Sequence, residues 1–343
     1  MSREIQGSNV CVVGGAGFLG SHLVAHLIED KQCKVLVIDN LVAGRREFIH
    51  PQAKFIHHDI TGSEHFLKEV FQRERIDYVF NYAAYPYIPV SFARPLHVSD
   101  VNAFGAMKVI NAAQEAGVKG ILQVSSAEIY GSGSSLDSPF NGSGERNEAG
   151  EVFGTSKIIE ESPVVPHSTY GASKAFIDSW IQVRAKEAQT PCIALRQFNC
   201  VGERETHPYV IPEIISQIHL AKGLNVTVKL GNNSFRDFQY AGDAVRMATE
   251  LLEKGGFGEV YNMGSESGVK IYDLAKMIGE IMGKQVTVEP DPTRVRPWEI
   301  WHLQSDNSKL YSVIESRAST SLQEALRLTV LDFYASSYKW TWQ

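Results

Sequence analysis

Hydrophobic residues in this chain form short runs that alternate with longer amphipathic stretches through its first two-thirds. Gly, Asp, Asn or Ser, residues that favour turns, bound each run. The predicted strands are residues 10–13, 35–38, 54–57, 78–82, 121–124 and 193–198. Alternating strands and helices are typical of βαβ units, and strands this apolar belong in a parallel sheet that is covered on both faces. The pattern therefore predicts an α/β fold built on a doubly wound parallel sheet.

One predicted helix carries clear signals at both of its ends. Pro95 can occupy the first turn, apolar side chains recur at helical spacing from Val98 to Ile110, and Gly117 is placed to terminate the helix. We expect this helix to lie on the sheet.

The rhythm changes after residue 198. Helices are predicted at about residues 212–221, 241–253 and 271–282, with strand-like pieces at 226–230 and 259–262. We therefore divide the chain into a first domain of residues 1–198 and a smaller mixed lobe formed mainly by residues 199–343.

Residues 131–156 interrupt the first domain with a segment rich in Gly, Ser, Asn and Glu. A loop this long inside a compact domain is usually functional or mobile. Two interpretations remain open: a solvated loop without catalytic consequence, or a substrate lid or subunit contact.

Composition narrows the class of protein. The 343 residues include 33 Lys and Arg against 39 Asp and Glu, a net charge of -6, so we expect no binding to nucleic acid or to an anionic membrane. No run approaches the roughly 18 apolar residues of a membrane span, and residues 1–9 are too polar for a secretory signal, which predicts a cytoplasmic protein. The four cysteines form no CxxC pair, so we expect neither a metal site nor a disulfide framework; they are Cys11, Cys33, Cys192 and Cys200.

The first predicted strand runs into a glycine-rich turn that opens a helix. The turn contains glycine at every third position, Gly14, Gly17 and Gly20, and Phe18 and Leu19 lie between the last two. Glycine lets the backbone approach a pyrophosphate, whose negative charge then lies against the free N–H groups of the helix start. The turn indicates a dinucleotide site in a Rossmann-type sheet.

Asp39 ends the next strand, 39 − 20 = 19 residues beyond Gly20. An acidic side chain there can accept hydrogen bonds from the adenosine ribose and repels a 2′-phosphate, which favours NAD over NADP. Arg45 and Arg46 keep the alternative open, because they could hold a 2′-phosphate if their loop folded back.

A Tyr-x-x-x-Lys spacing places both side chains on one helix face, where the ammonium can stabilise a phenolate. The chain contains this spacing twice, at Tyr170/Lys174 and at Tyr272/Lys276. Only the first pair follows, by 170 − 126 = 44 residues, a strand end that carries Ser126. We therefore interpret Tyr170 and Lys174 as catalytic and the second pair as part of an ordinary amphipathic helix.

With these motifs in order, the chain resembles the extended short-chain dehydrogenase/reductase family, in particular the NAD-dependent nucleotide-sugar epimerases and dehydratases. Further blocks similar to those of the family are residues 39–41, 44–46, 59–60, 81–84, 195–199, 236–238 and 296–299. The resemblance implies that residues 1–198 bind NAD, that the second lobe binds a nucleotide-diphosphate sugar, and that the protein is a homodimer.

The resemblance also implies roles for individual residues. Asp59 and Ile60 would border the adenine, Ala83 and Ala84 would border the central ribose and phosphates, and Asn102 would support the catalytic face. These residues, together with Asn40, Tyr170 and Lys174, complete the expected cofactor set. Asn199, Arg236 and Arg296 would bind the nucleotide diphosphate of the substrate, and specific arginines are suited to anion recognition in a protein of negative net charge.

The implied reaction begins with oxidation of the sugar. Tyr170 would take the proton of the C4 hydroxyl, which requires its pKa to fall from near 10 under the influence of Lys174 and the nicotinamide charge. Ser126 would hydrogen-bond the same oxygen, and the product of this step is a 4-keto sugar with NADH.

Glu128 decides the expected outcome. In this resemblance its position matches the carboxylate that removes the C5 proton in 4,6-dehydratases and also the glutamate of nucleotide-glucuronate decarboxylases, and a nucleotide-hexose 4,6-dehydratase is the leading hypothesis. Ala127 stands where many hexose dehydratases have an aspartate acid, so a 4-epimerase and a nucleotide-glucuronate decarboxylase remain alternatives. A non-catalytic NAD-binding scaffold is disfavoured by the intact Ser126, Tyr170 and Lys174.

Overall fold

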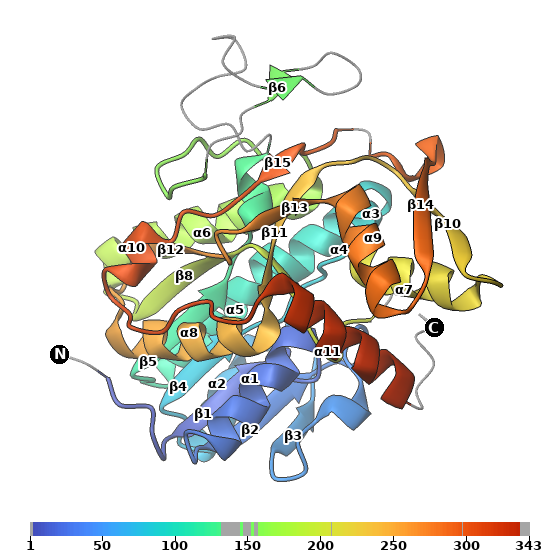
Figure 1. The fold of residues 1–343 in the computed structure, drawn as a ribbon. Helices are drawn as coiled ribbons and strands as arrows, with labels where there is room; N and C mark the ends of the chain where they lie inside the picture. Colours follow the sequence, from blue (N-terminus) through green and yellow to red (C-terminus); the bar gives the residue numbers. More distant parts are fainter. Residues whose placement is uncertain are drawn as a thin grey trace.

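A computed structural model describes residues 3–131, 145–146, 152–153, 157–206, 208–296 and 298–336. Its main sheet has seven parallel strands in the order β3, β2, β1, β4, β5, β8, β12 (Figure 1). The strands are β1 (Asn9–Val13), β2 (Lys34–Asp39), β3 (Lys54–His57), β4 (Tyr78–Asn81), β5 (Gly120–Val124), β8 (Cys192–Gln197) and β12 (Val260–Met263). The order reverses between β1 and β4, which is the Rossmann-type arrangement predicted from the sequence.

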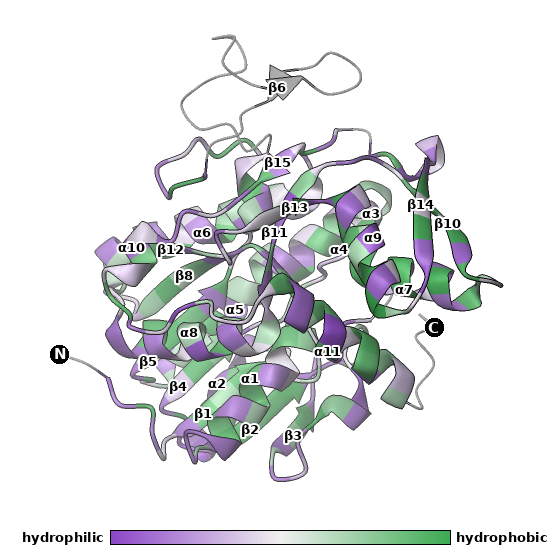
Figure 2. Ribbon diagram, in the orientation of Figure 1, coloured by the Kyte–Doolittle hydropathy of each residue, from purple (hydrophilic) through white to green (hydrophobic). Residues whose placement is uncertain are grey.

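Helices cover both faces of this sheet, because alternate residues of each strand point to opposite sides. Val10 and Val12 pack into the core under α1 (Phe18–Glu29) and α8 (Ala241–Lys254), whereas Cys11 and Val13 pack into the core on the other face. The helices of that other face are α2 (Glu64–Arg73), α5 (Ala106–Glu115) and α6 (Thr169–Ala188). The strands of the sheet are coloured mostly hydrophobic in Figure 2, in agreement with burial on both sides.

The predicted helix over residues 95–117 is present in three consecutive pieces. It runs through α4 (Pro95–Ser99), a π-helical segment (Asp100–Gly105) and α5, and it ends just before Gly117, which has φ +78°. π-Helical segments are rare and occur mostly at functional sites. Here the segment carries Asn102.

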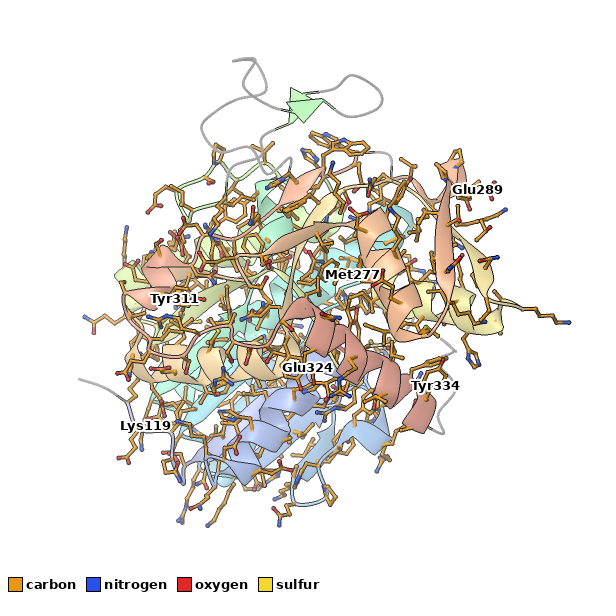
Figure 3. The ribbon with its side chains drawn as sticks, viewed as in Figure 1. Lys119, Met277, Glu289, Tyr311, Glu324 and Tyr334 are labelled. Atoms are coloured by element: carbon orange, nitrogen blue, oxygen red, sulfur yellow. The ribbon has the colours of Figure 1, made fainter. Side chains whose placement is uncertain are left out.

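The second lobe has its own hydrophobic core. Its helices are α7 (Val210–Leu220), α9 (Ile271–Ile281) and α11 (Leu322–Ala335), which pack around the parallel pair β10 (Asn225–Leu230) and β14 (Gln285–Pro290). In Figure 3 the labelled Met277 lies on α9, and Glu324 and Tyr334 lie on α11. A small sheet is formed by β9 (Asn199–Val201), β11 (Phe235–Tyr240), β13 (Gly268–Lys270) and β15 (His302–Leu303).

The boundary predicted at residue 198 does not separate the two lobes cleanly. Both α8 and β12 come after residue 198 in the sequence. However, α8 packs against α1, and β12 pairs with β8 in the main sheet. The chain leaves the first lobe after β8, returns to complete the sheet, and leaves again.

The predicted loop at residues 131–156 lies largely outside the described residues. Within it the structure describes Gly131 and an antiparallel pair of short strands, β6 (Glu145–Arg146) and β7 (Val152–Phe153).

Over the described ranges, no helix is long and apolar enough to cross a membrane. In the same part of the chain, no group of three or more His, Cys, Asp or Glu side chains could hold a metal ion. The cysteines are free thiols, and Cys11, Cys33 and Cys192 are buried.

A buried ion pair ties α6 to the main sheet. The guanidinium of Arg196 on β8 lies 2.8 Å from the carboxylate of Asp178 on α6, and their side chains are only 5% and 2% exposed. The same guanidinium donates hydrogen bonds of 2.7 Å to the Tyr130 hydroxyl and to the Glu160 carbonyl. Each of the three guanidinium nitrogens of Arg196 therefore has a hydrogen-bond partner.

We expect Asp178→Ala to lower the free energy of unfolding by about 3–5 kcal/mol, because it leaves the Arg196 cation buried without its counter-ion. Chemical denaturation followed by circular dichroism measures this change. The control is Asp273→Ala, which breaks a surface pair with Lys276 whose side chains are 57% and 56% exposed and should cost about 0–1 kcal/mol. Equal losses in the two variants would contradict the importance of the buried pair.

Candidate functional site

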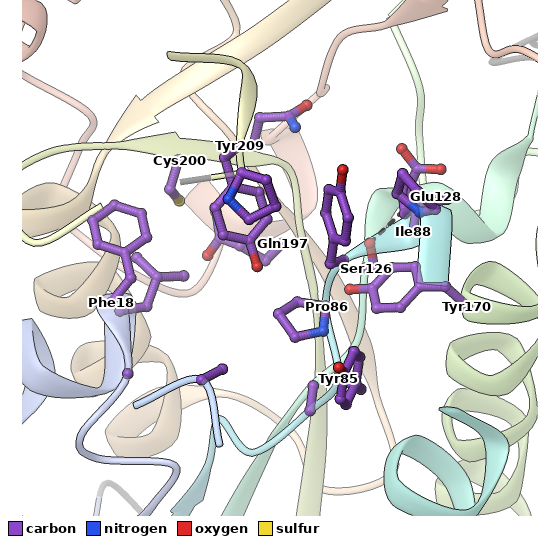
Figure 4. A pocket seen from close by; sticks show the side chains of 18 of the residues that line it. Phe18, Tyr85, Pro86, Ile88, Ser126, Glu128, Tyr170, Gln197, Cys200 and Tyr209 are labelled. Atoms are coloured by element: carbon purple, nitrogen blue, oxygen red, sulfur yellow. Dashed lines mark hydrogen bonds between the residues drawn. The ribbon is translucent and has the colours of Figure 1, made fainter. Parts of the chain in front are cut away.

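A cavity of about 900 Å³ opens at the carboxyl ends of the parallel strands and extends between the two lobes. Ligands of open α/β sheets bind in this position, where the strand order reverses. Residues after β1, β2, β4, β5 and β8 line the floor and sides, and residues of α7, β10 and the 292–299 segment line the rest. Figure 4 shows part of this wall.

The glycine turn after β1 is shaped to let the backbone approach the cavity. Gly14 has φ +80°, and a Cβ at this residue would lie 2.5 Å from the backbone nitrogen of Ala83. A Cβ at Gly20 would collide with the Gly14 carbonyl, so these glycines cannot carry side chains. Gly17 caps α1 without a side-chain hydrogen bond, and Phe18 and Leu19 in its first turn line the cavity. Free N–H groups of a helix start facing a cavity fit the pyrophosphate of a dinucleotide.

Asp39 lines the same cavity and holds the turn. Its carboxylate accepts hydrogen bonds from the backbone nitrogens of Ala16, at 3.0 Å, and Leu41, at 2.8 Å. Burial raises the pKa of Asp39, and these hydrogen bonds partly offset the increase. Arg45 and Arg46, the basis of the NADP alternative, are not among the residues that line the cavity.

The expected adenine end is built around two polar side chains. Asn40 donates a hydrogen bond of 2.8 Å to the carboxylate of Asp59, and both residues line the cavity together with Ile60. Ala83 and Ala84 also line it, and the nitrogen of Ala83 donates to the buried Asn81 side chain at 3.1 Å.

Asn102 does not line the cavity, although the resemblance placed it with the cofactor residues. Its buried amide accepts a hydrogen bond of 2.6 Å from the Tyr85 nitrogen and donates to the Tyr85 carbonyl and the Ser173 hydroxyl. The side chain therefore supports the cavity wall at Tyr85 from behind and does not face a ligand.

The structure brings together the residues predicted to be catalytic. The hydroxyl of Tyr170 is hydrogen-bonded to Ser126, and both residues line the cavity with Lys174 and Glu128. Burial raises the pKa of Tyr170 to about 12, although the Ser126 hydrogen bond opposes the increase. Burial lowers the pKa of Lys174 to about 8, and its ammonium donates to the Val124 carbonyl at 2.9 Å. The protein alone thus raises the Tyr170 pKa, and the decrease expected from the sequence depends on the nicotinamide charge as well as on Lys174.

The second Tyr-x-x-x-Lys pair lies away from this site. Tyr272 packs in the core of the second lobe on α9, and Lys276 is exposed and pairs with Asp273 at 3.1 Å. Neither residue lines the cavity.

The residues predicted to bind substrate also line the cavity. Asn199 is exposed at the start of β9, and Arg236 is buried on β11, where it donates to the Ile300 carbonyl at 2.7 Å. Arg296 lies between two carboxylates, 3.7 Å from Glu128 and 3.9 Å from Glu299. These are long ion pairs, so the Arg296 guanidinium is attracted by both carboxylates without a tight hydrogen bond to either.

Sequence reasoning missed several residues that line the cavity: Tyr85, Tyr87, Gln197, Glu205 and Tyr209. Tyr85 and Tyr87 directly follow β4, and Gln197 ends β8, so the rule that parallel strands present site residues at their carboxyl ends could have found these three. Glu205 and Tyr209 lie in the β9–α7 connection, where the sequence has no comparable signal.

Taken together, the parallel sheet, the glycine turn and the Ser126, Tyr170 and Lys174 constellation define a dinucleotide-binding enzyme of the extended short-chain dehydrogenase/reductase class. The NAD dependent epimerase/dehydratase family model matches residues 10–264, and the chain belongs to this family. Its cofactor is accordingly NAD, and the glycine turn and Asp39 fit this dinucleotide.

Relatives of two kinds are similar to this chain. The mouse (Mus musculus) dTDP-D-glucose 4,6-dehydratase is 32% identical over 280 residues, which cover 80% of this chain and 72% of that protein. The Lacticaseibacillus casei UDP-glucose 4-epimerase is 28% identical over 305 residues, which cover 83% of this chain and 85% of that protein. Among solved structures, the Thermus thermophilus UDP-glucose 4-epimerase complex with NAD has a TM-score of 0.80 at 27% identity and covers 96% of this chain and 99% of that one.

We expect Tyr170→Phe to reduce turnover at least roughly a hundredfold while the protein stays folded, because only the phenol hydroxyl is removed. Turnover and thermal unfolding of the purified variant measure both effects. Tyr272→Phe is the matched control and should keep near-native turnover. If the two variants lost activity equally, the assignment of the catalytic tyrosine would be wrong.

Proposed function

We propose that this enzyme oxidises the sugar of a nucleoside-diphosphate hexose at C4 and removes water across C5 and C6, as a nucleotide-hexose 4,6-dehydratase. The observation that carries the proposal is that the Tyr170–Ser126 pair and the Glu128 carboxylate line one cavity. The name of the mouse relative, dTDP-D-glucose 4,6-dehydratase, supports the same reaction.

Two arginines that line the cavity suit the diphosphate of such a substrate. The Arg236 guanidinium is fixed by the carbonyls of Phe235 and Ile300 and lies 3.4 Å from Glu299. Arg296, with a side chain 31% exposed, is held by longer contacts and can turn towards an anion. Bidentate arginine contacts are strong and specific for phosphate groups. We therefore assign the diphosphate to Arg236 and Arg296 and the neighbouring part of the nucleotide to Asn199.

In the proposed first step, Tyr170 accepts the proton of the C4 hydroxyl while Ser126 donates a hydrogen bond to the same oxygen. Bound NAD supplies the hydride acceptor for C4 and a positive charge that favours the phenolate. A pKa of about 12 for Tyr170 in the protein alone means that its proton is strongly held until positive charge is brought near the phenol.

Glu128 serves as the base in the proposed second step. Its side chain is 12% exposed, and its backbone nitrogen is hydrogen-bonded to the Ser126 hydroxyl oxygen at 3.2 Å. The carboxylate is therefore carried by the same short turn that carries the residue acting at C4. A base so close to Ser126 is suited to remove the proton from C5, the carbon next to C4. The C6 hydroxyl would leave as water with that proton, and C6 would then take back the hydride from bound NADH while C5 takes a proton, which gives the 4-keto-6-deoxy sugar and regenerates NAD.

A 4-epimerase is the second candidate, and Ala127 favours it. This residue is buried and has no acidic group to protonate the departing C6 hydroxyl. A 4-epimerase needs no such acid, because its keto intermediate only rotates and is reduced again. The Lacticaseibacillus casei relative, named a UDP-glucose 4-epimerase, supports this alternative.

Product mass separates the possible reactions. The purified protein is incubated with UDP-, GDP-, CDP- and dTDP-linked sugars, and the products are analysed by mass spectrometry. Loss of water is the expected result, loss of carbon dioxide would indicate a decarboxylase, and an unchanged mass with inverted C4 would indicate an epimerase.

We expect Glu128→Gln to accumulate enzyme-bound NADH on addition of substrate, while release of 4-keto-6-deoxy product falls roughly a hundredfold or more. The glutamine keeps the size of the side chain but cannot take the C5 proton. Absorbance of the reduced nicotinamide and chromatography of the product measure the two steps.

Solvent deuterium provides the control for this prediction. Native enzyme in deuterated water should incorporate deuterium at C5, because a dehydratase exchanges that proton with solvent. Absence of deuterium, together with a near-native rate for Glu128→Gln, would replace the dehydratase with the epimerase.

We also propose a homodimer through the outer face of α4, the π-helical segment and α6. These elements pack side by side and expose large apolar side chains: Leu96 at 85%, Phe104 at 53%, Phe176 at 45% and Val183 at 50%. The rings of Phe104 and Phe176 lie 6.1 Å apart, so the exposed groups of two elements meet in one patch. Apolar patches of this kind usually mark protein interfaces.

The chain has a mass of 38.1 kDa, and we expect light scattering to give twice this mass for the native protein. The Phe104→Glu variant should have the mass of the monomer. Burying an unpaired carboxylate in an apolar interface is unfavourable, so the dimer should dissociate. The control is Leu220→Glu, at a residue 80% exposed on α7 in the second lobe, which should leave the dimer intact. A monomeric native protein would refute the dimer.

A further inference from the structure

Three buried polar atoms without hydrogen-bond partners belong to residues that line the cavity. They are the hydroxyl of Tyr82, Oε1 of Gln197 and Oε2 of Glu205, each without a partner among the described residues. Buried polar atoms in folded proteins are nearly always satisfied, so an unsatisfied one beside a cavity points to a group that binds there. The Tyr170–Ser126 reaction uses none of these three atoms.

Glu205 is the most significant of the three because it is a carboxyl group. Its side chain is only 4% exposed in the connection between β9 and α7. Burial raises the pKa of Glu205 well above its usual value. A charged carboxylate in this place is costly unless a donor or a cation meets it.

The loop around Glu205 is fixed from several sides. The Glu203 carbonyl is hydrogen-bonded to the His22 ring of α1 at 2.8 Å, and its carboxylate accepts from the Tyr240 hydroxyl at 3.1 Å. The Arg204 nitrogen donates to the carboxylate of Asp332 on α11 at 2.9 Å. Glu205 is therefore held at the cavity wall by both lobes.

Glu205 lines the same cavity as the Tyr170–Ser126 pair. Tyr209, in the same connection as Glu205, also lines this cavity. Figure 4 shows Gln197, Cys200 and Tyr209 together on one side of the pocket, with Ser126, Glu128 and Tyr170 on the other. The Gln197 amide nitrogen is bonded to Gln239 and Met263, which leaves its oxygen for the cavity.

We propose that Glu205, assisted by Gln197, accepts hydrogen bonds from a hydroxyl or amino group on the hexose and thereby selects which sugar is processed. This inference rests on the proposed function, because it places the C4 carbon at Tyr170. The amide oxygen of Gln197 accepts hydrogen bonds, and a donor placed against Glu205 stabilises its ionised, accepting form, so the matching ligand group is a donor. A sugar without that donor leaves these buried polar atoms unpaired, and sites of this kind reject such analogues strongly.

Substrate analogues test the proposal on the native enzyme, without any variant. The hydroxyl groups at C2 and C3 of a nucleoside-diphosphate hexose accepted by the native enzyme are replaced in turn by hydrogen, fluorine, amine or acetamide. At one position we expect hydrogen and fluorine to lower kcat/KM by at least roughly a hundredfold. Retention of activity with the amine would identify a cationic group as an acceptable donor, and its loss would identify the hydroxyl.

Variants then connect this selectivity to Glu205. Glu205→Gln keeps one acceptor and should retain part of the selectivity, whereas Glu205→Met keeps the length of the side chain and should discriminate less than about threefold. The matched control is Glu203→Gln, two residues away, whose carboxylate contacts Tyr240 and does not line the cavity. Native selectivity is expected in this control.

These measurements distinguish the role of Glu205 from the proposed oxidation at C4. Turnover of every analogue at similar rates by native enzyme would overturn the role of Glu205 and leave C4 oxidation intact. The same conclusion would follow if Glu205→Met weakened NAD binding in calorimetry but kept full sugar selectivity. Absence of any 4-keto or epimerised product from the native enzyme with all nucleotide sugars would overturn the proposed function itself.

Discussion

The close approach of two backbone segments, the turn after β1 and the end of β4, is the constraint on which the rest of the site depends. No side chain fits between Gly14 and Ala83, so the chain can pass there only with glycine at positive φ. The Asp39 carboxylate fixes the same turn through Ala16, and the buried Asn81 fixes Ala83. Backbone atoms, rather than side chains, thus shape the part of the cavity that suits a dinucleotide, and the N-terminus of α1 is aimed at it.

Burial disfavours the charged forms of Tyr170 and Lys174. It raises the pKa of Tyr170 to about 12 and lowers that of Lys174 to about 8. A phenol held in this way becomes a useful base only when positive charge enters the site. Proton transfer is thereby linked to occupancy of the cavity, which suits an enzyme that must not react before its ligands are in place.

The two lobes divide the chemistry between them. The main sheet carries the glycine turn, Ser126 and the helix with Tyr170, whereas Arg236 comes from β11 of the small sheet. Arg296 connects the two sets, since it lies within 3.7 Å of Glu128 and 3.9 Å of Glu299. With a net charge of -6 the chain has no general attraction for an anion, so under the proposed function the two local arginines provide it.

The sequence by itself determined the elements and the local motifs, because burial on two faces and helix capping leave a pattern in consecutive residues. The predicted strand at residues 54–57 coincides with β3, the turn at Gly14 opens α1, and the spacing from Ser126 selected Tyr170, which lines the cavity, rather than Tyr272, which does not. Only the tertiary structure decided contacts between distant residues. In the folded chain β12 pairs within the main sheet, and Asn102 lies behind the cavity wall. Arg296 lies beside Glu128, and Glu205 lines the cavity. Such contacts depend on how whole lobes pack together, and no short stretch of sequence records that packing.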